Sequence, residues 1–240
     1  MIEIQNLNKK FGKLNVLNEV NLFTKKGECI ALIGPNGCGK TTLIKSILGM
    51  VIPDNGSINF DGHSILNKFE YRNNIGYMPQ IGRYPDNMKV GQIFEMVKEI
   101  RQNSNLDLEL YESFKIAEII DKKMSTLSGG TTQKVSASLA FMFNPEVLIL
   151  DEPTAGLDPI ASEILKEKIL KEKAKGKLIL ITSHLLSELD DLVSEIVFMQ
   201  DGCIQFHKSV QLLKSETQED KISKAIAQIL KSTSNFKSHE

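Results

Sequence analysis

Residues 34–41 carry the strongest chemical signal in the sequence. They read GPNGCGKT and follow the apolar run Cys29–Ile33, which we expect to be a buried strand. Glycines let the backbone curl around an anion, and bare N–H groups at the start of the next helix attract negative charge. Lys40 can reach the outer phosphates of a nucleotide, and the Thr41 hydroxyl can bind Mg²⁺. The spacing predicts a phosphate-binding loop, and a glycine-rich turn without a ligand is the alternative.

An acidic pair, Asp151 and Glu152, ends the apolar run Val147–Leu150. Adjacent residues of a strand point in different directions, so the two carboxylates can take different roles. Asp151 can hold a metal ion through its water shell, and Glu152 can orient or deprotonate a water molecule that attacks a phosphate. Two acids that merely end a strand are the alternative, which loses force because a phosphate-binding loop is predicted in the same sheet.

A second anion site is predicted at residues 128–130. Ser128 precedes a helical run and is a candidate N-cap, and Gly129 and Gly130 leave bare N–H groups at the start of that helix. A capped helix without a ligand is the alternative. The residues alone leave open whether the two predicted anion sites act on one nucleotide or on two.

The elements that must position these residues follow an α/β pattern. Strands are predicted at residues 2–7, 16–22, 29–33, 147–150, 178–182, 196–199 and 204–206, with a short strand before the turn Asp61-Gly62. Helices are predicted at residues 39–49, 159–174 and 185–192. Residues 84–124 have no strong strand signal and show helical spacing, which indicates a helical insertion.

The tail, residues 208–240, shows no strand pattern. Apolar residues recur on one helical face at Ile222, Ala225, Ile226, Ile229 and Leu230. This spacing predicts an amphipathic helix that ends before a polar, frayed segment, residues 232–240. We expect the helix to pack on its own domain, and contact with a second copy of the chain is the alternative.

The composition is that of an ordinary soluble protein. The 240 residues include 29 basic and 30 acidic ones, and a net charge near zero without a basic block argues against a nucleic-acid partner. The longest apolar stretches are far shorter than the ~20 residues of a membrane span, so we expect that the chain does not itself span the membrane. Three cysteines without CxxC spacing fit a reducing cytosol.

Four motifs, GPNGCGKTT, LSGG, LILDEP and His184 after LILITS, occur in the order that resembles the ATPase domain of ABC transporters. The resemblance covers residues 1–206. It implies an α/β fold, namely a P-loop NTPase core with an N-terminal antiparallel β subdomain and an inserted α-helical subdomain. We therefore expect an ATPase domain at residues 1–207, with the helical subdomain at about 84–145, and a C-terminal helical tail at residues 208–240.

The resemblance also implies roles for single residues. Phe11 would stack on adenine, Gln80 would lie near the metal and the membrane subunit, Asp158 would belong to a loop between subunits, Glu152 would be the catalytic base, and His184 would contact the γ-phosphate. Taken alone, Phe11 would more often be a core aromatic and His184 a surface histidine. The implied metal ligands are Thr41, Gln80 and Asp151. The implied nucleotide-binding residues are Phe11, Val16, Gly34, Pro35, Asn36, Gly37, Cys38, Gly39, Lys40, Thr41, Thr42, Gln80, Ser128, Gly129, Gly130, Asp151 and Asp158.

The implied cofactors are ATP and Mg²⁺, and the implied partners are a second copy and integral membrane transporter subunits. In this family the LSGG of one copy closes over the nucleotide of the other, which implies a homodimer held through ATP. We expect a cytoplasmic chain that is peripheral on the inner face of the cell membrane. Thr131 departs from the usual LSGGQ. Since the phosphate contacts are attributed to Ser128 and Gly130, we expect activity to survive and coupling strength to be what changes.

The cargo is inferred from sequence resemblance alone. Residues 127–159, residues 190–202 and the helical tail look similar to the ATPase component of the copper-site maturation transporter of nitrous oxide reductase. Generic single-domain exporter ATPases share most of these sequence features. A soluble ABC ATPase of translation or DNA repair is a rival, although the sequence has no second ATPase half, long coiled coil or zinc hook. We also hypothesise that alkylation of Cys38, in the phosphate loop, blocks nucleotide binding and that MgATP protects it.

Overall fold

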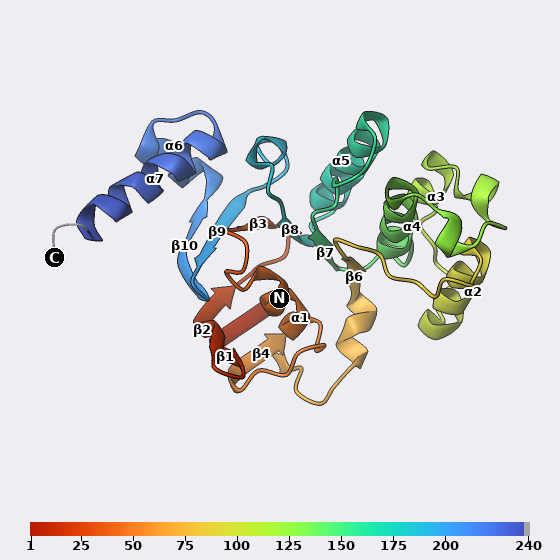
Figure 1. The fold of residues 1–240 in the computed structure, drawn as a ribbon, viewed down its shortest axis with the longest axis horizontal. Coiled ribbons are helices and arrows are strands. Elements are labelled where there is room, and N and C mark those ends of the chain that lie inside the picture. The colour runs from red at the N-terminus through yellow and green to blue at the C-terminus, as the bar shows by residue number, and fades with distance from the viewer. Residues whose placement is uncertain (238–240) are drawn as a thin grey trace.

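A computed structural model describes the backbone of residues 1–237 and the side chains of residues 1–230. Its first sheet is antiparallel and lies beside the N-terminus (Figure 1). The strand order is β2-β1-β4-β5, with β1 at Ile2–Phe11, β2 at Leu14–Phe23, β4 at Asn55–Phe60 and β5 at His63–Ser64. The predicted turn Asp61-Gly62 joins β4 to β5, and both residues have a positive φ, as a tight hairpin turn requires.

The second sheet is parallel except at one edge. Its order is β10-β9-β3-β8-β7-β6, with β3 at Cys29–Ile33, β6 at Ile75–Met78, β7 at Val147–Asp151, β8 at Leu178–Thr182, β9 at Glu195–Gln200 and β10 at Cys203–Ser209. β10 pairs antiparallel to β9, and the other neighbours are parallel. β3, β7 and β8 are buried along their whole length, because a parallel sheet is covered on both faces.

Alternate residues of the central strands face two different cores. Ile30 and Leu32 of β3 join the cluster formed with the antiparallel sheet and with helix α1, Lys40–Ile47. Ala31 and Ile33 join the opposite cluster, which includes helix α5, Pro159–Ala174. The predicted α/β fold with an antiparallel N-terminal sheet is confirmed.

Helices and loops without a strand make up residues 84–145 of the described chain. They contain α2 at Val90–Arg101, α3 at Glu109–Ser113, α4 at Gly129–Met142, and the 3₁₀ turns η2 at Ile116–Ile119 and η3 at Met124–Thr126. These helices lie together at the end of the molecule opposite the C-terminal helices (Figure 1). They share a core of their own around Ile93, Phe94 and Val135. The exact bounds of an inserted subdomain stay a prediction.

The prediction of a helix at residues 185–192 is wrong. Within this range the structure has only the 3₁₀ turn η4, Leu186–Glu188. A further 3₁₀ turn, η1, precedes β6 at Glu70–Asn74. The Ser183 hydroxyl accepts a hydrogen bond from the Leu185 N–H at 3.0 Å, a local contact that competes with helix formation.

The tail is helical, as predicted, although β10 extends into it as far as Ser209. Helix α6 spans Val210–Thr217 and α7 spans Ile222–Lys237. The α7 helix continues past residue 232, where we expected fraying, and residues 238–240 of that expected segment lie outside the described residues. Ile222, Ala225 and Ile226 are buried in the same core cluster as Leu189, Leu192 and Leu213, so the expectation that the tail packs on its own domain is confirmed.

Candidate active site

The phosphate-binding loop lies between β3 and α1, as the sequence predicts. Gly39 has φ 107°, and a Cβ there would lie 2.6 Å from the Val16 carbonyl oxygen, so only glycine fits. The Lys40 ammonium donates to the carbonyl oxygens of Gly34 at 2.7 Å and Pro35 at 3.1 Å. The lysine is thus folded back over its own loop, where it can exchange carbonyl partners for phosphate oxygens.

A cavity of about 480 Å³ opens beside this loop. It brings together residues from the loop, from the ends of β6 and β7, and from the segment after β8, because the carboxyl ends of parallel strands meet at one edge of the sheet. Its lining residues are Leu14, Val16, Asn36, Gly37, Gly39, Lys40, Thr41, Thr42, Gln80, Asp151, Glu152 and His184. The structure therefore gathers the predicted phosphate loop, acidic pair, glutamine and histidine around one space.

Phe11 does not line this cavity. Its ring is 51% exposed at the end of β1 and lies under the Lys9 ammonium, 5.4 Å from the ring centroid. Leu14, its partner across the hairpin, lines the cavity instead, together with Val16. Sequence reasoning missed Leu14, although its spacing of two residues from Val16 places both on one face of a strand.

Asp151 is buried at the end of β7. Its Oδ1 accepts a hydrogen bond from the Thr182 hydroxyl of β8 at 2.5 Å, which fixes the carboxylate at the cavity edge. Tyr77 of β6 lies near it, and burial followed by the charge of Asp151 raises the pKa of the Tyr77 phenol to about 12. Tyr77 is therefore neutral at physiological pH.

Glu152 follows with a backbone in the left-handed region, φ 51°. Non-glycine residues adopt this conformation rarely, and it persists where neighbours hold it in place. Here the Glu152 N–H donates to the carbonyl oxygen of Thr182 at 3.2 Å and to its hydroxyl at 3.0 Å. The turn sends the Glu152 carboxylate in another direction from that of Asp151, and its Oε1 lies 2.8 Å from Nε2 of His184.

Ser128 caps α4, as predicted. Its hydroxyl oxygen accepts from the Thr131 N–H at 3.3 Å and lies 2.9 Å from the Thr131 hydroxyl. A Cβ on Gly130 would lie 2.5 Å from the Gly156 carbonyl oxygen, whereas a Cβ on Gly129 would meet open space. Ser128 and Gly129 are exposed, and no residue of 128–130 lines the cavity.

Asp158 links the loop after β7 to α4. Its Oδ1 accepts from the Ala161 N–H at 2.9 Å and so caps α5, and its Oδ2 accepts from the Lys134 ammonium at 2.6 Å. The hydrogen bond from Lys134 holds the pKa of the Asp158 carboxyl below its ordinary value. Lys134 was not predicted from the sequence, and only its position on α4 could have suggested it.

Gln80 is exposed where the chain leaves β6, and its side chain lines the cavity. The backbone carbonyl oxygen of Gln80 accepts a hydrogen bond from the side-chain amide of the buried Gln133 at 2.8 Å, so α4 also holds the loop after β6. Thr41, Gln80 and Asp151 supply hydroxyl, amide and carboxylate oxygens to the same cavity, a donor set that suits Mg²⁺. Among the described residues no group of three or more His, Cys, Asp or Glu side chains forms a separate metal site.

The Cys38 thiol is buried. Its side chain lies inside the loop, with Sγ 3.8 Å from the Lys40 ammonium, and only 3% of the residue is exposed. A labelling reagent therefore reaches the thiol only when the loop opens.

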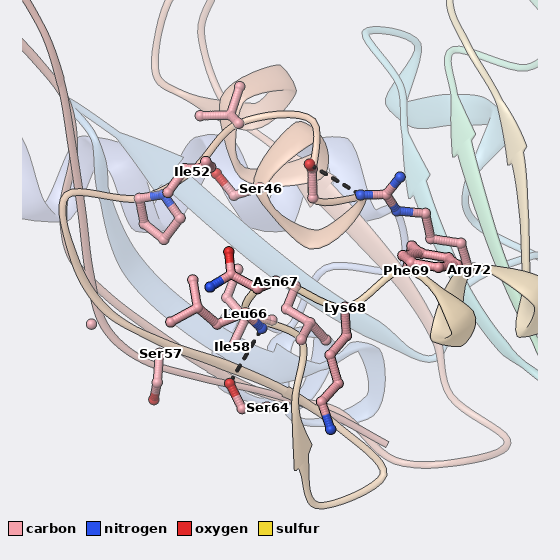
Figure 2. A pocket seen from close by; sticks show the side chains of 15 residues that line it. Ser46, Ile52, Ser57, Ile58, Ser64, Leu66, Asn67, Lys68, Phe69 and Arg72 are labelled. Atoms are coloured by element: carbon pink, nitrogen blue, oxygen red, sulfur yellow. Dashed lines mark hydrogen bonds between the residues drawn. The ribbon is translucent and has the colours of Figure 1, made fainter.

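A second cavity, of about 430 Å³, lies between the carboxyl end of α1, β4 and the segment 64–72 (Figure 2). Ile52, Ile58, Leu66 and Phe69 give it a mainly apolar wall, and Lys68 stands at its side. It contains none of the residues that the sequence predicts to be functional, whereas the cavity beside the phosphate loop is lined by many of them.

Comparison with known proteins gives a consistent result. The sequence profile of the ABC transporter family matches residues 17–155. The lantibiotic transport ATP-binding protein SrtF of Streptococcus pyogenes is 37% identical over 220 residues, which are 87% of this chain and 90% of the relative. The Nod factor export ATP-binding protein I of Burkholderia lata is 34% identical over 209 residues, which are 84% of this chain and 68% of the relative.

Solved structures agree. The ATP-binding subunit of an ABC transporter has a TM-score of 0.88 at 26% identity and covers 96% of this chain and 99% of its own. A dimeric ATP-binding cassette bound to ADP and Pi has a TM-score of 0.76 at 23% identity, covering 88% of this chain and 99% of its own, and shows the fold alone. The chain belongs to the ABC transporter family, as one of its ATP-hydrolysing, ATP-binding subunits. No helix among the described residues has the length and apolarity that a bilayer crossing demands.

Proposed function

We propose that this chain binds and hydrolyses ATP as an ATP-bridged homodimer and so drives an export process through integral membrane partner subunits. The observation that carries the proposal is a separation within one chain. The phosphate loop, Glu152 and His184 share a cavity, whereas Ser128 is exposed and lies outside that cavity. A second copy can then supply its Ser128 and Gly130 to the open side of the nucleotide.

The described residues suit in-line attack of water on the γ-phosphate. Lys40 and the loop N–H groups bind the phosphates, and Leu14 and Val16 offer an apolar surface to the base. Glu152 accepts a proton from the attacking water, and His184, 2.8 Å away, orients that carboxylate and can reach the γ-phosphate. Mg²⁺ held by Thr41, Gln80 and Asp151 would neutralise phosphate charge. Asp158, through its ion pair with Lys134, ties the loop after β7 to α4, the helix that Ser128 caps.

Loss of the γ-phosphate removes one of the groups that the two copies share, so hydrolysis loosens the dimer. Gln80 and the helices between residues 84 and 145 would carry this movement to the membrane subunits, since Gln133 of α4 is bonded to the Gln80 backbone. In this arrangement the chain works in the cytoplasm, at the inner face of the membrane, and is held there by its partners.

Two inactive variants test the composite site. In a mixture of Glu152→Gln and Ser128→Ala proteins, each mixed dimer has one site with both defects and one site with neither. We expect each variant alone to be nearly inactive and the mixture to regain ATP turnover. Wild-type turnover per chain should also rise with protein concentration. Turnover that is independent of concentration, with no gain on mixing, would show that one chain holds a complete site.

For the cargo, we propose export of an organic compound, because relatives at 34% and 37% identity are named for Nod factor export and lantibiotic transport. The copper-site maturation role rests on the sequences of residues 127–159 and 190–202 and on the helical tail, and neither relative's name supports it. The gene neighbours discriminate, since an adjacent membrane exporter gene favours export and a nitrous oxide reductase operon favours copper-site maturation. Co-purification with ribosomes instead of membranes would favour a soluble, non-transport ATPase.

A further inference from the structure

The segment that carries His184 is held by contacts at both of its ends. We call residues 184–193, between β8 and β9, the switch segment. Its backbone hydrogen bonds are local turn contacts, such as Leu189 N–H to Leu186 O at 3.1 Å and Val193 N–H to Leu189 O at 3.1 Å. Apart from the short 3₁₀ turn η4, the segment has no helix or strand ladder, so the partners of its side chains decide where His184 lies.

On the catalytic side the anchors reach the acidic pair and the loop after it. His184 Nε2 lies 2.8 Å from Oε1 of Glu152. One turn later, Glu188 Oε2 accepts a hydrogen bond from the Thr154 hydroxyl at 2.5 Å, and Thr154 is two residues from Glu152. The first half of the switch segment is therefore tied to the residues proposed to activate water.

On the other side the anchors reach the C-terminal helices. Asp190 Oδ1 accepts a hydrogen bond from the Ile222 N–H at 2.9 Å, at the first residue of α7. The Lys214 ammonium of α6 lies 4.0 Å from the same oxygen. A carboxylate at this position satisfies a free helical N–H and meets the positive end of the helix dipole, so the contact is favourable and directional.

Apolar packing reinforces this anchor. Leu189 and Leu192 of the switch segment are buried in the same cluster as Ile222, Ala225 and Ile226 of α7. Leu189 is 1% exposed and Leu192 is 4% exposed. Removal of α7 would uncover these leucines and free the segment on the side away from Glu152.

We propose that α7 sets the position of His184, with Asp190 as the positioning residue through which it acts. This inference rests on the proposed ATPase function. The tail thereby has a role in turnover. When α7 is docked, it keeps the switch segment where His184 meets Glu152. When α7 is undocked, the segment is released and His184 can leave the site. Nucleotide binding by the phosphate loop does not depend on this contact, because the switch segment contributes only His184 to the cavity wall.

The test compares Asp190→Ala with Asp191→Ala in the full-length chain. Asp191 is the exposed neighbour in the same segment, so its removal changes charge equally without touching α7. We expect Asp190→Ala to lower kcat by about two- to tenfold, the effect of losing one helix cap, with KM for ATP unchanged. Asp190→Asn keeps an acceptor for the Ile222 N–H and should recover most of the rate.

A His184→Ala background separates positioning from general damage. If Asp190 acts through His184, adding Asp190→Ala to that background should lower kcat no further. Equal kcat for the two aspartate variants, a change in KM alone, or full additivity with His184→Ala would overturn the proposal. Failure of the wild-type chain to hydrolyse ATP would instead contradict the proposed function.

Discussion

His184 Nε2 lies 2.8 Å from Glu152 Oε1, so the two residues proposed to act on the γ-phosphate are already in contact with each other. The contact joins the end of β7 to the segment after β8, which are neighbours in the parallel sheet. Glu152 adopts a left-handed backbone to reach it. A strained conformation at the carboxylate proposed to be the base is consistent with an arrangement that is set before the substrate binds.

Glu152→Gln should bind ATP and stabilise the dimer but hydrolyse ATP very slowly. The amide keeps the shape of the side chain and cannot accept a proton from water, so we expect kcat to fall on the order of 10²- to 10⁴-fold. Turnover and ATP-dependent sizing of the purified chain are the measurements. Glu163→Gln, on the exposed face of α5, is the matched control and should behave as the wild type. Near-normal turnover of Glu152→Gln would remove this residue from the role of base.

His184 and Glu152 should act as one unit. Because their side chains touch, the loss of kcat in a double variant, His184→Ala with Glu152→Gln, should be much smaller than the product of the two single losses. The four proteins of this cycle need only steady-state ATPase rates at saturating ATP. Independent effects, with losses that multiply, would mean that the 2.8 Å contact has no role in turnover.

The sequence predicted the α/β core because its signals are local. The runs at residues 29–33, 147–150 and 178–181 are continuously apolar, as buried parallel strands are. Strand β6, Ile75–Met78, was missed because it has only four residues and contains Gly76. The helix expected at residues 185–192 did not form, and the local hydrogen bond from the Leu185 N–H to the Ser183 hydroxyl competes with its first turn.

The candidate site was predictable where a motif carries it and was not where contacts cross the fold. The phosphate loop, Asp151, Glu152, Gln80 and His184 meet in one cavity, as the motif order suggested. The contacts of Lys134 with Asp158 and of Gln133 with Gln80 join residues 24 and 53 positions apart. No periodicity reports such pairs, because they depend on how separate elements pack.

Gly130→Ala should destabilise the isolated chain, and Gly129→Ala should not. A Cβ at residue 130 would lie 2.5 Å from the backbone oxygen of Gly156, far inside van der Waals contact, whereas a Cβ at residue 129 meets open space. We expect the free energy of unfolding to fall by about 1–3 kcal/mol for Gly130→Ala, the usual cost of overpacking. Urea unfolding of the nucleotide-free chain measures it. Equal stability of the two variants would show that the loop after β7 can move away from a Cβ at residue 130 with no loss in the free energy of unfolding.

A buried charge cluster around Lys168 of α5 should make the free energy of unfolding depend on pH in the acid range. Lys168, 1% exposed, contacts Asp107 at 2.5 Å, Glu109 at 2.8 Å and Glu172 at 3.0 Å. Burial opposes ionisation of Glu172, but hydrogen bonds from Lys175, Lys177 and Lys168 outweigh it and lower its pKa from 4.5 to about 2. The ionised carboxylate therefore stabilises the fold fully above about pH 4.5.

This stabilisation is lost as the pH falls from 4.5 towards 2, because the unfolded chain then takes up a proton before the folded one does. The loss attributable to Glu172 is about 3 kcal/mol over that range. We expect Glu172→Gln to be less stable than the wild type at pH 6 and to approach it at low pH, as measured by urea unfolding at a series of pH values. Glu163→Gln, which is two-thirds exposed, is the matched control and should follow the wild type. A difference between wild type and Glu172→Gln that stays constant from pH 6 to pH 3 would mean that the lysines do not hold this carboxylate in its ionised form.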